Sequence, residues 1–314
     1  MRVFITGGTG FIGTKLSQRL VEGGHEITVL TRDSSKAKRA LPGNIDIVEG
    51  DPTREGKWQE VVAQHDAVIN LAGASIFGRW SKRYKQIIRD SRISTTRNIV
   101  SALSSREGKE GKEGKEGKTH LLNASAVGYY GFHGDEVLDE RNAEGSGFLA
   151  EVTKEWENTA LLAEQFNTRV VLCRFGIVLG EKGEGGAMDK LIPLFRYYLG
   201  SPLGSGKQWF SWIHIDDLVN ALEFILNNKD LEGPVNCTSP NPVRNEELTR
   251  TLAKVMGKRV ILPSVPKFVL KIALGEFADT VVEGQRVLPR KLMDSGFEFQ
   301  YPDIKEAFED IVSQ

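Results

Sequence analysis

The feature that most constrains the fold is a glycine-rich turn near the amino terminus, in the segment VFITGGTGFIGTKL. An apolar strand ending at Thr6 runs into Gly7, Gly10 and Gly13, and an amphipathic helix follows. Glycine permits positive φ angles and close approach of a pyrophosphate, and the missing side chain at Gly13 lets the helix pack against the strand. Free N–H groups at the start of such a helix favour phosphate binding. The turn therefore predicts a dinucleotide-binding βαβ unit.

Short apolar runs alternate with amphipathic stretches through the first half of the chain. The runs are rich in β-branched residues or leucine, which suits central strands that are covered on both faces. This alternation predicts an α/β fold, a Rossmann-type doubly wound parallel sheet with right-handed crossovers. The expected strands are residues 2–6, 26–31, 45–50, 67–72, 120–125 and 169–175.

The second half is less regular, with turn-dense segments and short helices rich in proline and aromatic residues. We interpret it as a smaller carboxyl-terminal substrate lobe that is interleaved with the sheet. The expected Rossmann domain comprises residues 1–175, and residues 208–232 return to it. Residues 176–207 and 233–314 form the smaller lobe.

Composition and charge argue against several classes of function. The 314 residues carry a net charge of −1, which gives no electrostatic attraction for nucleic acid or an anionic membrane. No apolar run approaches the roughly 18 residues that span a bilayer, and no secretory signal precedes the first strand. We therefore expect a cytoplasmic protein, either a monomer or a homodimer. The histidines and cysteines show no metal-ligand spacing, and no Gly-x-Ser-x-Gly motif predicts a serine hydrolase.

One segment, residues 107–118, consists of four tandem Glu-Gly-Lys triplets. Its glycine density disfavours a stable helix. We predict a solvated loop without a role in function.

The end of the second strand indicates which dinucleotide binds. Folds that take NAD usually carry an acidic residue there, which holds the ribose 2′-hydroxyl. This chain has Thr31 and then Arg32, and a guanidinium suits a 2′-phosphate that a carboxylate would repel. Asp33 follows, but its side chain should point away from that of Arg32. We therefore predict NADP as the cofactor.

The spacing Gly7–Gly10–Gly13 resembles the extended, epimerase-like branch of the short-chain dehydrogenase/reductase superfamily. This resemblance implies that Asp51 reads the adenine amino group and that NLAG, residues 70–73, lines the adenine ribose. The implied cofactor site comprises Gly7, Gly10, Phe11, Ile12, Gly13, Thr31, Arg32, Asp51, Leu71, Ala72, Gly73 and Arg92.

Four longer motifs narrow the resemblance to atypical members of that branch. Such members carry names such as epimerase-family protein, nucleoside-diphosphate-sugar epimerase or cell-division-inhibitor-like protein. The resemblance covers nearly the whole chain except the Glu-Gly-Lys insert. Its motifs are SAVGYYG (125–131), RFGIVLG (174–180), GSGKQWFSWIHIDDLVNAL (204–222) and SPNPVRNEEL (239–248).

Ordinary members of the superfamily use a Tyr as general acid or base, with a Lys four residues along the same helix lowering its pKa. A Ser holds the substrate carbonyl, and Ser125 is the candidate here. When Glu157 is aligned with the glutamate that commonly follows the Lys, Leu149 and Thr153 take the positions of Tyr and Lys. The resemblance therefore implies that the usual Tyr-x-x-x-Lys dyad is absent from this helix, since Lys154 is one residue out of place.

Two hypotheses remain open. In the first, the chain is an NADP-dependent oxidoreductase or epimerase acting on a small carbonyl or sugar-like substrate. Tyr129 or Tyr130 then supplies the hydroxyl from the loop after Ser125, and Lys154 reaches the same site. In the second, the protein is a non-catalytic NADP-binding regulatory module that acts through a protein partner.

The second half supplies candidates for the substrate side. Lys207 and Arg244 could meet an anionic substrate, although a salt bridge near the next helix explains Arg244 equally well. In WIHIDDL we expect a structural role for Asp217, with His214 a candidate for lining the site. The residues expected in the cleft wall or in the core of the lobe are Met188, Trp209, Phe210 and Trp212.

Overall fold

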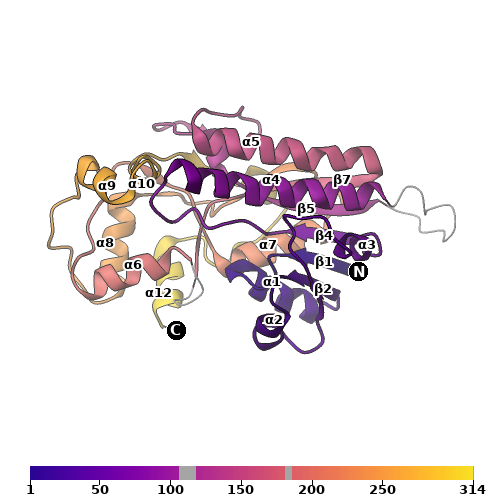
Figure 1. The fold of residues 1–314 in the computed structure, drawn as a ribbon. Helices are drawn as coiled ribbons and strands as arrows, with labels where there is room; N and C mark the ends of the chain where they lie inside the picture. The colour runs from indigo at the N-terminus through magenta and orange to yellow at the C-terminus, as the bar shows by residue number, and fades with distance from the viewer. Residues whose placement is uncertain (106–117, 181–185, 314) are drawn as a thin grey trace.

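The computed structural model describes residues 1–105, 118–180 and 186–313. Residues 107–117 of the Glu-Gly-Lys repeat lie outside the described residues. A seven-stranded parallel sheet, in the order β11-β7-β5-β4-β1-β2-β3, forms the centre of the molecule (Figure 1). The expected strands are all present, and the doubly wound fold is confirmed. The strands are β1 (Arg2–Thr6), β2 (Glu26–Thr31), β3 (Asp46–Glu49), β4 (Ala67–Asn70), β5 (Thr119–Ala126), β7 (Thr168–Phe175) and β11 (Gly233–Cys237).

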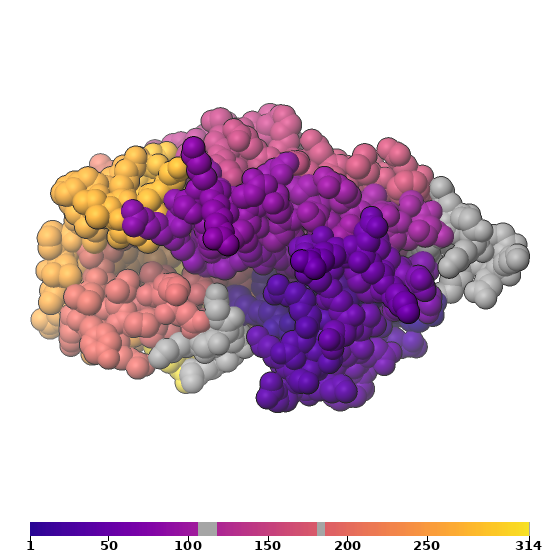
Figure 2. Space-filling view, viewed as in Figure 1, coloured from indigo at the N-terminus to yellow at the C-terminus, as the bar shows by residue number. Residues whose placement is uncertain are grey.

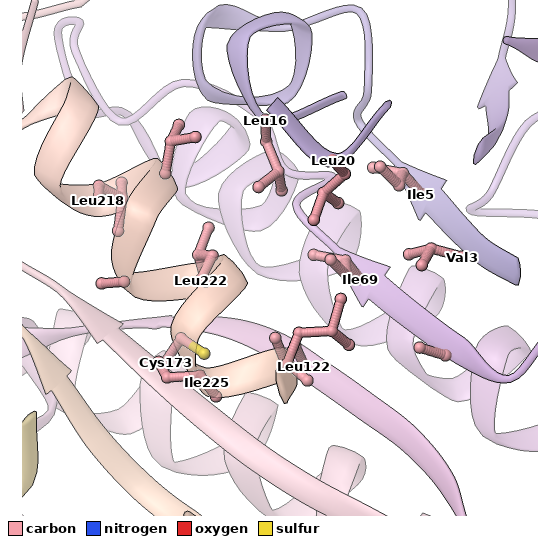
Figure 3. Close-up of a cluster of buried hydrophobic side chains, with 14 of the residues drawn as sticks. Val3, Ile5, Leu16, Leu20, Ile69, Leu122, Cys173, Leu218, Leu222 and Ile225 are labelled. Atoms are coloured by element: carbon pink, nitrogen blue, oxygen red, sulfur yellow. The ribbon is translucent and has the colours of Figure 1, made fainter. Parts of the chain in front are cut away.

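Helices cover both faces of the sheet because successive strand residues point to opposite sides. Val3 and Ile5 pack in the cluster that contains α1 and α7 (Figure 3), whereas Phe4 packs in the cluster that contains α4. The first face carries α1 (Phe11–Glu22), α2 (Ser34–Ala40) and α7 (Ile215–Asn227). The second face carries α3 (Trp58–Val62), α4 (Lys82–Ser104), α5 (Phe148–Leu161) and the 3-10 helix η2 (Leu162–Phe166).

The smaller lobe has a core of its own, in which Met188, Trp212 and Phe308 are fully buried. Its helices are α6 (Met188–Arg196), α8 (Asn245–Val255), α9 (Lys267–Leu274), α10 (Phe277–Val282), α11 (Arg290–Asp294) and α12 (Ile304–Ser313). Three short strand pairs form separate two-stranded sheets: β8 (Ile177–Leu179) with β10 (Trp212–His214), β9 (Trp209–Phe210) with β12 (Val243–Arg244), and β6 (Val137–Leu138) with β13 (Arg286–Val287). Within the described ranges, no helix has both the length and the apolar character needed to cross a membrane.

One boundary differs from the expected division. The second part of the lobe is expected to begin at residue 233, but residues 233–237 form β11, which pairs with β7 from Gly233↔Val171 to Cys237↔Phe175. The strand contains Gly233 and Pro234, which are poor signals for a strand. Proline is nevertheless tolerated here because β11 lies at the edge of the sheet.

Candidate functional site

The turn between β1 and α1 has the geometry of a phosphate cradle. Gly7 has a φ of 73°, and its carbonyl accepts the N–H of Gly10 at 3.0 Å. A Cβ on Gly13 would lie 2.1 Å from the Gly7 carbonyl oxygen, so only glycine permits α1 to pack this closely. The start of α1 has no side-chain cap, which leaves its N–H groups available to an anion. These features fit a dinucleotide pyrophosphate.

The end of β4 lies directly against this turn. A Cβ on Gly7 would be 2.8 Å from the Leu71 carbonyl carbon and 2.9 Å from the Ala72 nitrogen. Glycine is also needed at residue 180, where a Cβ would lie 2.7 Å from the ring of Phe11. In the lower half of Figure 2, the indigo amino-terminal segments and the salmon segment of the smaller lobe lie on opposite sides of the molecule.

The end of β2 presents Arg32 to solvent. Asp33 turns away from it as expected, because its carboxylate caps α2 by accepting the N–H of Lys36 at 2.9 Å. In the described part of the chain, Arg32 has no ion-pair partner within 4.0 Å. Burial tends to raise the pKa of Asp51, but hydrogen bonds from Thr53 and the charges of Arg32 and Arg54 hold it below its usual value. Thr31 pairs with Glu49 across β2 and β3, so Arg32 and Asp51 follow the ends of neighbouring strands.

Arg92 of α4 reaches the same edge of the sheet from the other side. Its guanidinium lies against Gly73, where a Cβ would be 3.2 Å from Cζ. Nη1 donates to the carbonyl oxygens of Ala74 at 3.1 Å and Ile88 at 3.0 Å. Burial lowers the pKa of Arg92 to about 10.

Ser125, at the end of β5, belongs to a buried polar chain. Its hydroxyl donates to Glu157 of α5 at 2.5 Å, and Arg174 of β7 donates to the same carboxylate through Nε and Nη2, both at 2.8 Å. All three side chains are buried. The Ser125 proton is thus committed to Glu157, and the hydroxyl can offer a substrate only its lone pairs.

Tyr130 continues this chain. It ends the 3-10 helix η1 (Val127–Tyr130), is fully buried, and donates to Asn236 Oδ1 at 2.8 Å while accepting from Arg174 at 2.9 Å. Burial raises the pKa of its hydroxyl to about 12. Glu140 completes the chain by accepting the backbone N–H of Asn236 at 3.0 Å.

Tyr129 has a different environment from its neighbour. Its ring lies over the Arg174 guanidinium, 3.5 Å from Cζ to the ring centroid, and its hydroxyl donates to Glu144 at 3.3 Å. Lys154 also pairs with Glu144, so Lys154 meets Tyr129 through a carboxylate and not directly. Burial raises the pKa of Tyr129, and Arg174 opposes that shift.

The inner face of α5 carries no acid or base in the first two turns. Leu149 packs near Gly128, where a Cβ would be 3.2 Å from the leucine Cβ. Thr153 is buried and its hydroxyl donates to the Leu149 carbonyl at 2.7 Å. These residues, with Glu157, follow an i, i+4, i+8 spacing and share one face of the helix.

A cleft of about 690 Å³ lies on the lobe side, beyond η1. Trp209 forms part of its wall, with Arg244 stacked on the ring at 4.0 Å and Arg286 at 4.5 Å. Arg244 also pairs with Asp135, which confirms a salt bridge but not one to the following helix. Lys207 also lines the cleft. Met188 and Trp212 are instead buried in the core of the lobe, and Phe210 is partly buried against that core.

His214 and Asp217 stabilise the junction of lobe and sheet. His214 is buried and caps α7 by accepting the N–H of Asp216 at 3.2 Å; its ring contacts the tilted ring of Tyr301, with the ring centroids 4.0 Å apart. Asp217 accepts the N–H groups of Gln300 and Tyr301, so its expected structural role is confirmed. His214, Asp216 and Asp310 lie close enough together to approach one ion. However, Nδ1 of His214 accepts the Asp216 N–H, so the proton of the neutral imidazole lies on Nε2, which faces Asp310.

The centre of the buried polar chain could not be predicted from the sequence. Arg174 lies in the motif RFGIVLG and Glu157 serves to align the helix, but neither pattern predicts a role for them; Asn236 and Glu140 lie outside the four motifs. A buried ion pair between residues far apart in sequence leaves no local pattern. The available signal is a charged residue, Arg174, inside the otherwise apolar run VVLCRF.

Comparison with known families places the chain among dinucleotide-binding proteins. A family model described as the NAD dependent epimerase/dehydratase family matches residues 3–237, and a domain of unknown function, DUF1731, matches residues 265–311. A relative from Arabidopsis thaliana, named epimerase family protein SDR39U1 homolog, chloroplastic, is 45% identical over 99% of this chain and 87% of its own length. The epimerase family protein YfhF of Bacillus subtilis is 36% identical over 100% of this chain and 98% of its own length.

Solved structures agree with this placement. The human epimerase family protein SDR39U1 (isoform 2), solved with NADPH, is 32% identical and matches with a TM-score of 0.83 over 100% of both chains. UDP-glucose 4-epimerase from Thermotoga maritima, solved with UDP-glucose, has a TM-score of 0.80 over 100% of this chain and 98% of its own, but 17% identity, so the likeness concerns the fold alone. The chain belongs to the NAD dependent epimerase/dehydratase family, within a group of relatives named epimerase family protein SDR39U1.

Proposed function

We propose that the protein is an NADP-dependent oxidoreductase or epimerase that acts on a small carbonyl or sugar-like substrate. The observation that carries this proposal is the position of Arg32. It directly follows β2, the strand next to β1 and its glycine turn, and Asp51 follows the end of the neighbouring strand β3. Among the described residues, Arg32 has no ion-pair partner within 4.0 Å. A fork of donors at this place suits the 2′-phosphate of NADP. The relative solved with NADPH supports the same choice of cofactor.

A bound nicotinamide would supply or accept the hydride. Among the residues near the end of β5, Tyr129 is our candidate proton donor, because its ring is only partly buried and its raised pKa keeps it protonated at neutral pH. Glu144 holds its hydroxyl, and Lys154 holds Glu144. Ser125 and Tyr130 act in this proposal as positioning residues, because both hydroxyl protons are committed inside the buried chain.

The cleft beside Trp209 is the candidate site for the body of the substrate. It offers an aromatic surface together with the cations Lys207 and Arg244, which suits a polar or anionic group such as a sugar phosphate. Asp135 and Glu246 also line it, so the cleft is not uniformly positive. The cleft alone therefore favours a ligand that carries both hydroxyl groups and negative charge.

A specific observation also favours the second hypothesis, a regulatory module that binds NADP without turnover. Leu149 and Thr153 leave the first two turns of the inner face of α5 without an acid or base, and Tyr130 is fully buried. If Tyr129 does not donate a proton, only Lys154 remains of the residues we proposed for catalysis, and it is paired with Glu144. Binding of the cofactor would then change the contact with a protein partner.

One experiment separates these hypotheses. Calorimetry with NADPH, NADP⁺, NADH and NAD⁺ measures cofactor binding, and absorbance of the reduced cofactor follows turnover with ketones, quinones and nucleotide sugars. Turnover that Tyr129→Phe abolishes, and that Tyr197→Phe leaves unchanged, supports the enzyme; Tyr197 is the control because its side chain is 71% exposed. Tight NADPH binding without oxidation across the panel supports the module. Absence of any binding of NADPH or NADP⁺ contradicts both.

A further inference from the structure

Two segments of the smaller lobe carry most of the exposed apolar side chains. Among the described residues, fifteen large apolar side chains are exposed, and nine of them lie in residues 190–199 and 254–272. The two segments touch, because the Lys258 ammonium lies over the ring of Tyr198, 4.6 Å from its centroid, and the chain just after the first segment forms a β-bridge to the second. Together they form what we call the apolar surface, at the end of the molecule that carries α6, α8 and α9 (Figure 1).

Helix α9 is the most exposed part of the apolar surface. Of its eight residues, KFVLKIAL, only Leu270 is buried, whereas Phe268 and Ile272 are 66% and 73% exposed. A helix that is apolar on most sides is normally covered by other parts of a protein. Contiguous exposed apolar residues bordered by polar ones are typical of interaction sites. The apolar surface is therefore a candidate docking surface.

The charged residues within the same two segments are all positive. Residues 190–199 and 254–272 contain seven Lys and Arg residues and no Asp or Glu. Lys267 and Lys271 pair with carboxylates in α10 and just after it. In the described ranges, the other five cations form no ion pair; they are Lys190, Arg196, Lys254, Lys258 and Arg259. The net charge of −1, which by itself predicts no attraction for an anionic membrane, thus conceals a local excess of positive charge.

This charge indicates which kind of partner fits. A second copy of the chain, docked by a two-fold axis, would bring the same cations face to face, which is unfavourable. The apolar side chains also lie on a helix and loops outside the cleft beside Trp209, since none of them lines that cleft. A bilayer with anionic lipids matches both properties, because its acyl boundary accepts apolar side chains and its headgroups attract Lys and Arg.

We propose that the apolar surface attaches the protein to a bilayer that contains anionic lipids, with α9 lying in the plane of the interface. Phe268, Val269 and Ile272 enter the acyl boundary, while the unpaired cations of the two segments contact the headgroups. Such attachment does not cross the bilayer, and no helix of the described residues is suited to do so. The inference goes beyond the proposed function and does not depend on it.

Vesicle sedimentation with the full chain tests the proposal. The probes are vesicles of phosphatidylcholine alone and of an equimolar mixture with phosphatidylglycerol. We expect binding to the mixed vesicles, much weaker binding to phosphatidylcholine alone, and release by added salt, which screens surface charge. Phe268→Gln combined with Ile272→Gln should weaken binding to mixed vesicles about 10- to 100-fold, because apolar area no longer enters the bilayer. Arg196→Glu combined with Arg259→Glu should weaken it at least about 10-fold.

Matched control variants change the same kinds of residue elsewhere. Ile87→Gln combined with Leu162→Gln replaces two exposed apolar side chains outside the apolar surface. Lys38→Glu combined with Arg39→Glu makes the same change in net charge on exposed residues of α2. Both controls should bind mixed vesicles within about threefold of the unaltered protein. Circular dichroism and urea unfolding verify that each variant is folded, as expected for exposed positions.

The proposal fails if the unaltered protein does not bind mixed vesicles, if it binds phosphatidylcholine alone equally well, or if the variants of the apolar surface bind as tightly as the controls. Sedimentation equilibrium without lipid addresses the second copy. A dimer that Phe268→Gln with Ile272→Gln dissociates, in a protein that ignores vesicles, assigns the surface to self-association instead. If a double variant does not fold, Ile272→Gln or Arg259→Glu alone should still weaken vesicle binding several-fold, and unchanged binding counts against the proposal.

Discussion

Glu157 of α5 and Arg174 of β7 form a bidentate ion pair that is almost completely buried, with 5% and 3% of their side chains exposed. Removing one partner of such a pair leaves the other charge buried without compensation, which costs about 3–5 kcal/mol. We expect Glu157→Gln and Arg174→Met each to lower the free energy of unfolding by an amount in this range. Urea titration followed by tryptophan fluorescence measures it. A loss below about 1 kcal/mol for both variants would show that the pair is solvated.

Gly13 is the glycine for which the turn leaves least space. Gly13→Ala places a Cβ 2.1 Å from the Gly7 carbonyl oxygen and 2.6 Å from the Gly8 Cα, so the turn must move. We expect NADPH binding to fall below detection by calorimetry and the stability to drop by roughly 1–3 kcal/mol, as for other overpacked sites. Gly43→Ala is the matched control because nothing lies within 4 Å of its added Cβ. Normal NADPH affinity in Gly13→Ala would place the cofactor elsewhere.

Arg32 should determine the preference of the protein for NADPH over NADH. Arg32→Ala removes a charged hydrogen-bond donor from the 2′-phosphate, which should weaken NADPH binding about 10- to 100-fold and leave NADH binding unchanged. Arg54→Ala serves as control, because Arg54 is 84% exposed and also lies near Asp51, at 3.9 Å. An equal loss of affinity for NADPH and NADH would mean that Arg32 does not read the phosphate. Calorimetry with both cofactors gives the ratio.

His120 should make stability depend on pH. Burial and the charges of Arg169 and Lys229 lower its pKa to about 4, from an ordinary value of 6.5, and its Nδ1 accepts from Arg169 Nε at 3.1 Å. The unfolded chain therefore binds a proton that the folded chain does not, as the pH falls from 6.5 towards 4. As the pH falls across this window, the free energy of unfolding should decrease by about 3 kcal/mol. Above pH 6.5 the contribution of His120 is complete.

The test is the difference between the original protein and His120→Asn, in which an amide oxygen can accept from Arg169. Urea unfolding at intervals between pH 7.5 and 4.5 should show a smaller loss of stability in the variant. Comparing the two proteins removes the contribution of His25 and His214, whose pKa values burial also lowers. Parallel curves for the two proteins would exclude His120 as the cause.

Much of the fold could be predicted because its signals are local. The strands β1 to β5 and β7 follow from runs of apolar residues, and the turn at Gly7 follows from glycine spacing within one βαβ unit. β11 could not be predicted because its sequence, GPVNC, contains proline and glycine and because it joins the sheet by pairing with β7. Its identity as a strand depends on a neighbour about sixty residues earlier in the chain.

The candidate site divides in the same way. The positions of Gly7, Gly13 and Asp33 could be anticipated because each is fixed by its own strand–turn–helix unit. The environments of Tyr129 and Tyr130 could not, although the two residues are adjacent. Tyr130 is fully buried beside Asn236, a residue of β11, whereas Tyr129 contacts Glu144 near the surface.

The sequence by itself determined the doubly wound sheet and the glycine cradle at its edge, because periodicity and backbone freedom are properties of neighbouring residues. Only the tertiary structure decided which polar side chains are committed to one another and which remain available. Arg174 donates to Glu157 and Tyr130, whereas Arg92 has no carboxylate within 4.0 Å among the described residues. Charge pairing depends on distances of a few ångströms between separate elements, and those distances exist only after the helices have packed on the sheet.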